Sequence, residues 1–314
     1  MSETINKQAR VFYSRGKLLL TGEYAVLRGA QALALPSKLG QYLEVSEGDE
    51  TGVLFWKSIS PSGKWFEARF SLPELDVISS TDNEKADVLR DLLMTARQLR
   101  SGFLAKETSL CVTSTLEFFP EWGLGSSSSL VSNVGDWARC DPFELNQRVF
   151  HSSGYDVACA RSKSSIFYRL VNDLPEIITA KFRPSFAGNL WLIYLNEKKN
   201  SKHAVKAFAE LDIDAKVLER ISSIAVETAT ATDLDAFCAL MNEHEKLVGG
   251  MTGQIPVKER LFSGFDGCIK SLGAWGGDFI LAATKWSEEE VRKWFGERGY
   301  ETVLPFNEMI SYDR

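Results

Sequence analysis

The segment Pro120-Glu-Trp-Gly-Leu-Gly-Ser-Ser-Ser-Ser-Leu130 carries the strongest signal in this chain. Two glycines separated by one residue run into four serines, and a helix-compatible stretch follows from Leu130 to Arg139. Glycines allow positive φ angles and close approach of the backbone to a ligand, so consecutive N–H groups can point into one concavity. The following helix adds unpaired N–H groups and the positive end of its dipole. The segment therefore predicts a cradle for a polyphosphate, and a polar surface loop is the alternative for so short a motif.

Composition places the chain among soluble globular proteins. Its 314 residues suffice for two domains, with 44% hydrophobic and 25% charged residues and a net charge of −6. This charge argues against nucleic acid as a partner, for which a basic face is expected. No apolar run approaches the roughly 20 residues needed to cross a bilayer, and Met1–Lys7 lacks the apolar centre of a signal peptide. We expect a cytoplasmic protein with a small-molecule substrate, as a monomer or homodimer, with neither nucleic acid nor membrane as partner.

Cysteine and histidine usage favours a reducing compartment. The cysteine count is odd, no CxxC pair occurs, and the three histidines are scattered, so neither a zinc site nor a disulfide framework is predicted. The five cysteines are Cys111, Cys140, Cys159, Cys238 and Cys268.

The hydrophobic pattern predicts a mixed α+β fold. In the first half, short apolar segments at 11–13 and 17–20 precede strands at 41–45, 53–59, 65–70 and 109–117 and helices at 82–102 and 142–150. In the second half, the pattern predicts a strand at 190–195, helices at 201–211, 215–229, 233–247 and 257–272, a strand ending at Thr284 and a helix at 287–298. Asp141 is the predicted N-cap of the 142–150 helix, with Pro142 in its first turn. A boundary near Phe182 divides the chain into lobes 1–181 and 182–314.

Further motifs flank the Gly/Ser segment. Arg15-Gly-Lys-Leu-Leu-Leu-Thr-Gly-Glu-Tyr-Ala-Val26 precedes it, and Lys270-Ser-Leu-Gly-Ala-Trp-Gly-Gly-Asp-Phe279 lies near the C-terminus. Between them stand Ser153-Gly-Tyr-Asp-Val-Ala158 and the helical segment Met241–Val248. In order and spacing these segments resemble the signature motifs of the GHMP kinases, which include galactokinase, homoserine kinase, mevalonate kinase and phosphomevalonate kinase. The segments at 22–27 and 154–158 look closest to phosphomevalonate kinases, and the chain most resembles a branch named for its GYDIA sequence.

This resemblance implies a two-lobe fold, with an N-terminal lobe like ribosomal protein S5 domain 2 and a ferredoxin-like C-terminal lobe. It also implies ATP and Mg²⁺ as cofactors, with Ser127 as the leading Mg²⁺ ligand. The residues that would wrap the ATP phosphates are Gly123, Leu124, Gly125, Ser126, Ser127 and Ser128. The chain contains no GxxxxGK[ST], so this cradle is not a Walker P-loop.

The resemblance assigns catalysis to Asp156 and Lys17. With an alcohol acceptor, the carboxylate of Asp156 would take or orient the hydroxyl proton. With a phosphate acceptor, which is already ionised, Asp156 would chiefly position groups and tune Lys17. Lys17 would bridge donor and acceptor oxygens and neutralise charge in the transition state. The residues expected to contact substrate are Glu23, Tyr24, Gly154, Tyr155, Gly273 and Gly276, whereas His244 is expected to serve the core or the surface.

The chain departs from the family pattern in several places. Arg15 stands where a proline usually precedes the Gly-Lys pair. Gln147 occupies the position of a glutamate that commonly binds the metal, so Ser127 and Gln147 form the expected metal set, with Glu144 as a possible substitute one turn away. His151 and Ser152 stand where small glycines are expected. Either the site has been rebuilt or its activity is reduced.

The resemblance leads us to expect an ATP-dependent kinase for a mevalonate-type acid, with phosphomevalonate preferred over mevalonate. A sugar or homoserine kinase is the alternative within the same class. A nucleotide-binding or regulatory homologue with weak turnover is favoured by Gln147, and opposed by the joint retention of Lys17, Asp156 and the Gly/Ser segment. A diphosphomevalonate decarboxylase is a third candidate, which CO₂ release would distinguish.

Overall fold

The computed structural model describes residues 9–197, 208, 211, 213–273, 275 and 277–312. They form two compact units, each assembled from separate segments of the chain. The first unit comprises the chain up to Gly16, Leu39–Pro120 and Gly125–Arg161. The second comprises Lys17–Lys38, Glu121–Leu124 and the chain from Ser162 onward. The predicted lobes 1–181 and 182–314 stay a prediction.

Two long strands pass through both units. They are β1 (Arg10–Thr21) and β2 (Ala32–Glu47), which pair with each other. The sequence predicts two short apolar segments around Gly16, but the structure has one continuous strand there. Within the first unit the second half of β2 pairs antiparallel with β6, Gln41 opposing Leu116. Within the second unit its first half pairs antiparallel with β7, Ala32 opposing Tyr168.

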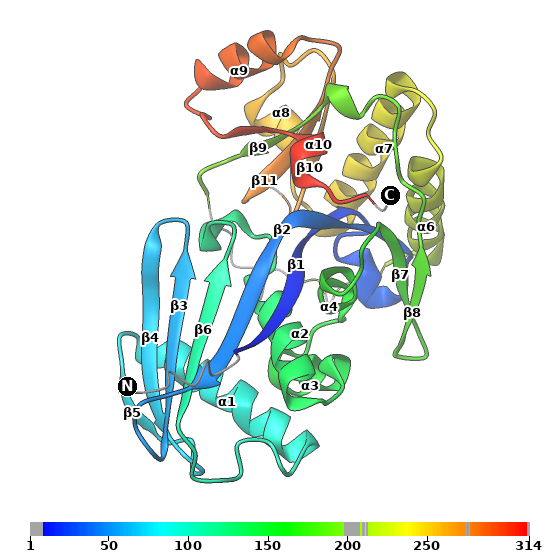
Figure 1. Cartoon of the computed structure of the whole chain (residues 1–314). Helices are drawn as coiled ribbons and strands as arrows, with labels where there is room; N and C mark the ends of the chain where they lie inside the picture. The colour runs from blue at the N-terminus through cyan, green and yellow to red at the C-terminus, as the bar shows by residue number, and fades with distance from the viewer. Residues whose placement is uncertain are drawn as a thin grey trace. The chain divides into compact units, whose positions relative to one another are not determined.

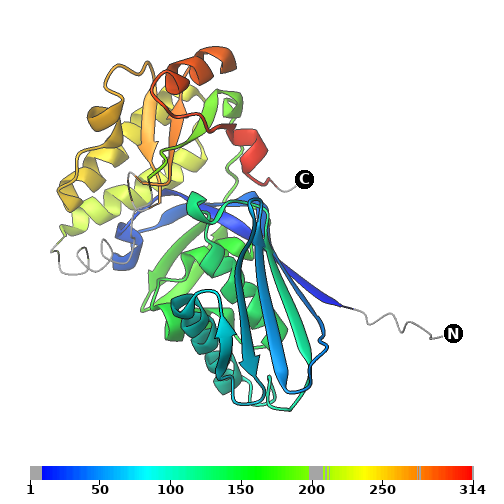
Figure 2. The ribbon, with the colours of Figure 1, turned by 90° about the vertical axis from the view of Figure 1, so that its left-hand side faces the viewer.

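The first unit is a sheet whose helices lie on one face (Figure 1). The strand order is β5-β4-β3-β6-β2, in which β3 and β6 pair in parallel and the other neighbours in this order pair antiparallel. The strands are β3 (Val53–Ser60), β4 (Gly63–Ser71), β5 (Val77–Ser80) and β6 (Leu110–Leu116). The helices are α1 (Asn83–Leu99), α2 (Ser126–Ala138), α3 (Pro142–Phe150) and α4 (Tyr155–Ala160). The 3₁₀ turn η2 (Pro120–Trp122) precedes α2 in the chain, and its last two residues belong to the second unit. Figure 2 shows the helices and the strands of this unit as two layers.

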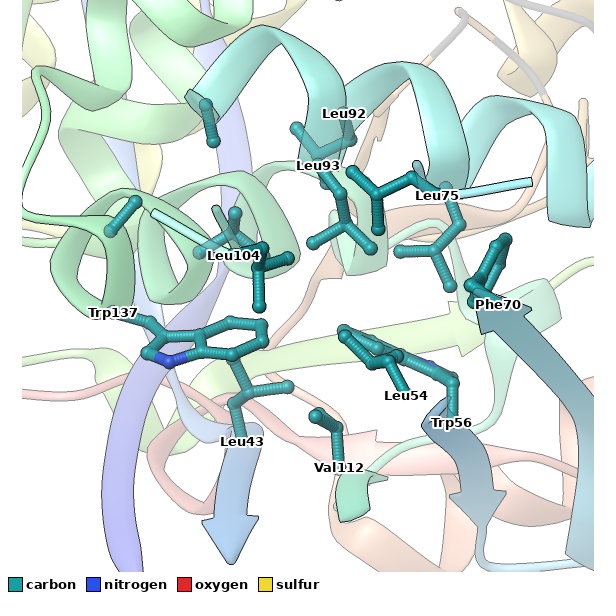
Figure 3. Close-up of a cluster of buried hydrophobic side chains, with 14 of the residues drawn as sticks. Leu43, Leu54, Trp56, Phe70, Leu75, Leu92, Leu93, Leu104, Val112 and Trp137 are labelled. Atoms are coloured by element: carbon teal, nitrogen blue, oxygen red, sulfur yellow. The ribbon is translucent and has the colours of Figure 1, made fainter. Parts of the chain in front are cut away.

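The core of the first unit lies between these two layers. On α1, buried side chains recur at helical spacing, at Ala86, Leu89, Leu93 and Ala96. On β3, alternate side chains point inward, and Trp56 is 1% exposed. Figure 3 shows how the two layers meet, with Trp137 of α2 beside Leu43 of β2 and Leu104.

The second unit combines a hairpin, a four-stranded antiparallel sheet and a set of helices. The hairpin strands are β7 (Ile166–Val171) and β8 (Leu174–Thr179). The sheet has the order β10-β11-β9-β12, formed by β9 (Leu190–Tyr194), β10 (Cys268–Ser271), β11 (Phe279–Ala283) and β12 (Val303–Pro305). The helices are α6 (Ala215–Ala229), α7 (Leu234–Thr252), α8 (Val257–Leu261), α9 (Glu288–Gly296) and α10 (Phe306–Met309). Two 3₁₀ turns complete it, η1 (Ala25–Arg28) and η3 (Ala187–Asn189).

Helices with strong local signals form as the sequence predicts. Asp141 caps α3 by accepting a hydrogen bond from the backbone N–H of Phe143, and Pro142 opens the helix. Helix α6 spans Ala215–Ala229, as predicted, and begins after a second aspartate cap, Asp214. The predicted α+β class is therefore confirmed.

One predicted helix is wrong. The apolar pattern at 257–272 predicts a single helix, but α8 ends at Leu261 and Cys268–Ser271 form strand β10. Gly267 explains the break, because it has φ +140° and a Cβ there would lie 2.1 Å from the carbonyl oxygen of Ala283. The backbone approaches β11 too closely at this point to continue a helix.

Two further predicted helices are those at 201–211 and from Leu130 onward. The predicted helix at 201–211 lies outside the described residues, apart from Phe208 and Leu211. Helix α2 begins at Ser126, earlier than predicted, so the four serines form its first turn instead of a loop. Among the residues that the structure describes, no helix combines the length and apolarity needed to cross a membrane.

Candidate functional site

The Gly/Ser segment forms the start of helix α2 in the first unit. Gly125 is the N-cap in a left-handed conformation, φ 86° and ψ 45°, and it has no side chain with which to cap the helix. The first N–H groups of a helix have no partner within it, so this end presents donors and a positive partial charge. Ser126 is half-buried, and Ser127 is the exposed member of the four serines. Local geometry thus suits an anion at this end of α2.

The next two serines serve the helix itself. The hydroxyl of Ser128 donates to the carbonyl oxygen of Gly125 at 2.9 Å. The hydroxyl of Ser129 lies 2.6 Å from Oε1 of Gln41 on β2. Ser128 therefore has its backbone N–H, and not its hydroxyl, to offer a phosphate.

A buried polar network fixes α2 against the sheet. The hydroxyl of Ser14 lies 2.7 Å from that of Ser132 and 2.9 Å from Oδ1 of Asn133. Nδ2 of Asn133 donates to the carbonyl oxygen of Gln41 at 2.9 Å, and Nε2 of Gln41 donates to Ser114 at 2.7 Å. Because buried polar groups cost free energy unless they are hydrogen-bonded, this network favours one position of α2 on β1, β2 and β6.

Asp156 lies in the first turn of α4, which packs on α2 and α3. Gly154, at φ 85°, is the N-cap of α4, and Tyr155 is its half-buried first residue. Asp156 is half-buried as well, and its Oδ1 accepts a hydrogen bond from the N–H of Val157 at 3.0 Å. The segment that carries the predicted catalytic carboxylate is therefore held against the helix that begins with the Gly/Ser segment.

Helix α3 presents its predicted metal ligands to solvent. Gln147 and Glu144 are both exposed, and Glu144 accepts a hydrogen bond from Arg148 at 2.5 Å. The buried polar residue of α3 is Asn146, whose Nδ2 donates to the hydroxyl of Ser152 at 2.7 Å. His151 ends the helix with φ 51°, a left-handed conformation that explains why a glycine is expected there.

In the second unit the first motif reaches the Gly/Ser segment through its backbone. Lys17 is half-buried on β1, and its N–H donates to the carbonyl oxygen of Leu124 at 2.8 Å. Leu124 is buried, with 2% of its surface exposed. Within the second unit, the pairing places the predicted catalytic lysine on a backbone segment next to Leu124.

The third motif closes against the same segment. Gly123 has φ 66°, and a Cβ there would lie 2.1 Å from Oδ2 of Asp278. Gly273 also has a positive φ, 62°, and a Cβ there would lie 3.4 Å from Oδ2 of Asp278. Gly276 lies outside the described residues. Glycine is therefore required at position 123 by both backbone conformation and space.

Gly123→Ala tests this close approach. We expect a lower melting temperature and a loss of about 1–3 kcal/mol of unfolding free energy, because a Cβ must displace Asp278 while the backbone keeps a left-handed φ. Gly102→Ala is the matched control, since no atom lies within 4 Å of its Cβ position and its φ is ordinary. Equal melting temperatures of both variants would contradict the requirement.

The first motif turns sharply after β1. Gly22 has φ 91°, and a Cβ there would lie 2.6 Å from the Cβ of Ala32. Its N–H donates to Nε2 of His244, on α7, at 2.9 Å. Tyr24 follows, buried and stacked on Phe208 with ring centroids 5.4 Å apart. The turn is thus anchored to the helical segment Met241–Val248 that the sequence singles out.

Next to this turn lies a buried group of charged side chains. Lys270 of β10 is 0% exposed and forms ion pairs with Glu23, itself 1% exposed, and with Glu245 of α7. The Glu245 carboxylate also accepts hydrogen bonds from the hydroxyl of Ser271 at 2.6 Å and the indole N–H of Trp275 at 3.1 Å. One cation and two carboxylates thus join the first motif, α7 and the third motif, and we call this set the buried ion network.

Burial dominates the titration of this network. It raises the pKa of Glu23 to about 7, and the charge of Lys270 opposes the rise. Burial alone would lower the pKa of Lys270, but Glu23 and Glu245 outweigh it, so that pKa is raised. Burial, and then the charge of Lys270, holds the pKa of His244 well below its usual range. His244 is therefore neutral near pH 7, as its acceptance of the Gly22 N–H requires.

Sequence reasoning missed the buried ion network. Lys270 lies in the third motif and Glu245 in the helical segment Met241–Val248. The sequence gives neither residue a role, because their partners are distant in the chain. A lysine within the apolar run Cys268–Leu272 is a signal of a buried charge in the sequence. The incorrect prediction of one helix over 257–272 hid that signal. His244, which the sequence assigns to the core or the surface, is fully buried.

Comparison with known proteins establishes the fold. No family profile matches the chain, and no curated protein matches it in sequence. Among solved structures, Methanococcus jannaschii mevalonate kinase is 16% identical with a TM-score of 0.71, covering 98% of this chain and 100% of that one. Streptococcus pneumoniae phosphomevalonate kinase, solved with phosphomevalonate and AMPPNP, is 17% identical with a TM-score of 0.68, covering 94% and 99%. Lactococcus lactis galactokinase, solved with galactose, is 14% identical with a TM-score of 0.63, covering 97% and 94%.

These similarities span nearly the whole of each chain. The GHMP kinase fold that the motifs predict is therefore confirmed. Identities of 14–17% show the fold alone, because one fold can host different substrates.

Proposed function

We propose that this chain is an ATP-dependent kinase of the GHMP type that phosphorylates a mevalonate-type acid, with phosphomevalonate preferred over mevalonate. The observation that carries the proposal is the uncapped start of α2 at Gly125, in a chain with the GHMP kinase fold. The similarity to kinases for mevalonate and phosphomevalonate supports the substrate class.

The N–H groups at the start of α2 suit the phosphates of ATP, and the side-chain oxygens of Ser127 and Gln147 are the kind of ligand that Mg²⁺ binds. Backbone N–H groups from Gly123 to Ser128 would bind the phosphates, since Gly125 leaves the helix start without a side-chain cap. The exposed hydroxyl of Ser127 and the side-chain oxygen of Gln147 would hold Mg²⁺, which prefers oxygen ligands. The ion would supply neutralisation of phosphate charge.

Lys17 and Asp156 are the proposed catalytic residues. The ammonium group of Lys17 would stabilise the charge of the transferring phosphoryl group, and Asp156 would accept or orient the acceptor proton. Tyr24, Gly154, Tyr155, Gly273 and Gly276 remain proposed substrate contacts. Glu23 is better assigned to positioning, because its carboxylate is buried and paired with Lys270.

The galactokinase similarity favours a second candidate, a kinase for a sugar. A panel of acceptors separates the two. ADP release would be measured with ATP and Mg²⁺ against mevalonate, phosphomevalonate, homoserine and several sugars. A signal that depends on phosphomevalonate supports the proposal, and a signal with a sugar replaces it with the second candidate. Silence across the panel, with ATP binding still detectable by thermal shift, would favour a homologue that binds nucleotide without turnover.

Lys17→Met separates catalysis from folding. We expect kcat/KM to fall by about 10²–10³-fold with little change in melting temperature, because methionine retains the backbone N–H that donates to the carbonyl oxygen of Leu124. Lys181→Met, at an exposed position, is the control. A melting temperature that falls in step with activity would assign Lys17 to structure.

Gln147→Glu tests the proposed metal set. A carboxylate binds Mg²⁺ more strongly than an amide oxygen, so we expect half-maximal activity at a lower Mg²⁺ concentration, by severalfold. Glu144→Gln distinguishes the alternative ligand one turn away, and it also removes the Arg148 ion pair. An unchanged Mg²⁺ titration for Gln147→Glu would exclude position 147 from the metal set.

A further inference from the structure

Two cysteines of the second unit meet where helix α7 packs on strand β10, the two elements labelled in Figure 1. The thiol of Cys238, on α7, donates to the carbonyl oxygen of Ala283 with a sulfur–oxygen distance of 3.9 Å. Ala283 is the direct cross-strand partner of Cys268, the first residue of β10. Both cysteines therefore lie around one residue of β11, and each thiol is close enough to affect the ionisation of the other.

The two thiols differ in exposure and in acidity. Cys238 is half-buried, whereas Cys268 is 1% exposed. The neighbouring Cys268 lowers the pKa of Cys238 against the effect of burial, Lys258 contributes in the same direction, and Asp235 opposes it. The neighbouring Cys238, and then burial, raise the pKa of Cys268 well above its usual range. Since the thiolate is the nucleophile in disulfide exchange, the more accessible sulfur is also the more reactive one.

We propose that Cys238 and Cys268 are a modification site, which forms an intramolecular disulfide when the protein meets a small-molecule disulfide such as oxidised glutathione. The thiolate of Cys238 attacks one sulfur of the oxidant, whose S–S bond breaks and releases one glutathione thiolate. Cys268 then loses its proton and attacks the Cys238 sulfur of the mixed disulfide, releasing the second glutathione. Two protein thiols are oxidised and one glutathione disulfide is reduced to two thiols, so electrons and atoms balance.

The cross-link would lie beside the buried ion network. Cys238 and Glu245 are seven residues apart on α7, which places them on one helix face about two turns apart. Cys268 and Lys270 are two residues apart on β10, on one face of the strand. A disulfide would therefore tie together the two elements that carry Glu245 and Lys270. This inference does not depend on the proposed kinase activity.

The test is thiol counting and peptide mapping on the full chain after exposure to oxidised glutathione without reductant. The chain has five cysteines, so five thiols should titrate in denaturant before oxidation and three afterwards. We expect the intact mass to fall by two hydrogens, the peptides containing Cys238 and Cys268 to become linked, and dithiothreitol to reverse both changes. Five remaining thiols, a link between other cysteines, or a link between two chains would overturn the proposal.

Variants separate the two steps. Cys268→Ala should accumulate a glutathione adduct on Cys238, because the second thiol is missing. Cys238→Ala should form neither adduct nor link at Cys268, which is buried. Cys111→Ala, a half-buried cysteine in the first unit, is the matched control and should keep the link. The wild-type peptide map decides the proposal even if Cys268→Ala, in the core, fails to fold.

Discussion

Asp156→Asn is expected to lower kcat by at least about a hundredfold while nucleotide binding and melting temperature stay near wild type. The reason is that an amide cannot accept the acceptor proton or supply negative charge in the transition state. The fold should tolerate the change, because an asparagine oxygen can still accept the hydrogen bond from the N–H of Val157. The measurements are steady-state ADP release, nucleotide titration and thermal melting.

Asp87→Asn is the matched control for this variant. Asp87 has the same charge and lies exposed on α1, so its replacement should leave kcat unchanged. If Asp156→Asn kept wild-type turnover with the best acceptor, Asp156 would have no part in the mechanism. If it lost activity together with nucleotide binding and thermal stability, its role would be structural.

Lys270→Met is expected to give the largest loss of stability, about 3–5 kcal/mol of unfolding free energy. The change removes the cation that pairs with both Glu23 and Glu245, and leaves two carboxylates buried together. An uncompensated buried charge costs far more than a lost surface pair. Chemical denaturation followed by circular dichroism would measure the difference.

Two variants make this result specific. Lys285→Met breaks an ion pair with Asp235 whose side chains are 72% and 78% exposed, so it should change the unfolding free energy little or not measurably. Adding Glu23→Gln to Lys270→Met should restore part of the lost stability, since one buried carboxylate becomes neutral. A Lys270→Met protein as stable as Lys285→Met would show that the buried ion network contributes little.

The fold could be predicted wherever the signals are local. Asp141 and Pro142 define the start of α3 within two residues, and the helical spacing of Leu89, Leu93 and Ala96 identifies α1. The error at 257–272 arose because a short buried strand and a helix share an apolar pattern, and only the contact of Gly267 with β11 separates them.

The candidate site is also predictable from the sequence where its residues are consecutive, and not where they are distant in the chain. Gly125 and the serines after it predict a helix start that can bind an anion, because the backbone N–H donors belong to consecutive residues. Glu23 gives no such sign of its partner, since Lys270 lies 247 residues further along the chain. Proximity in space between distant residues depends on the assembled fold, so the sequence motifs name Glu23 as a substrate contact where the structure pairs it with Lys270.

The separation of Glu23 from Lys270 has a consequence for folding during synthesis. The ribosome releases the first motif long before β10 exists, and the second unit collects segments from the start, the middle and the end of the chain. A nascent chain that stops short of residue 270 would have to bury Glu23 without its counter-ion or leave β1 unpacked. Folding of the second unit is therefore completed only after translation has passed strand β10, and C-terminal truncation would expose the N-terminal motif to proteases.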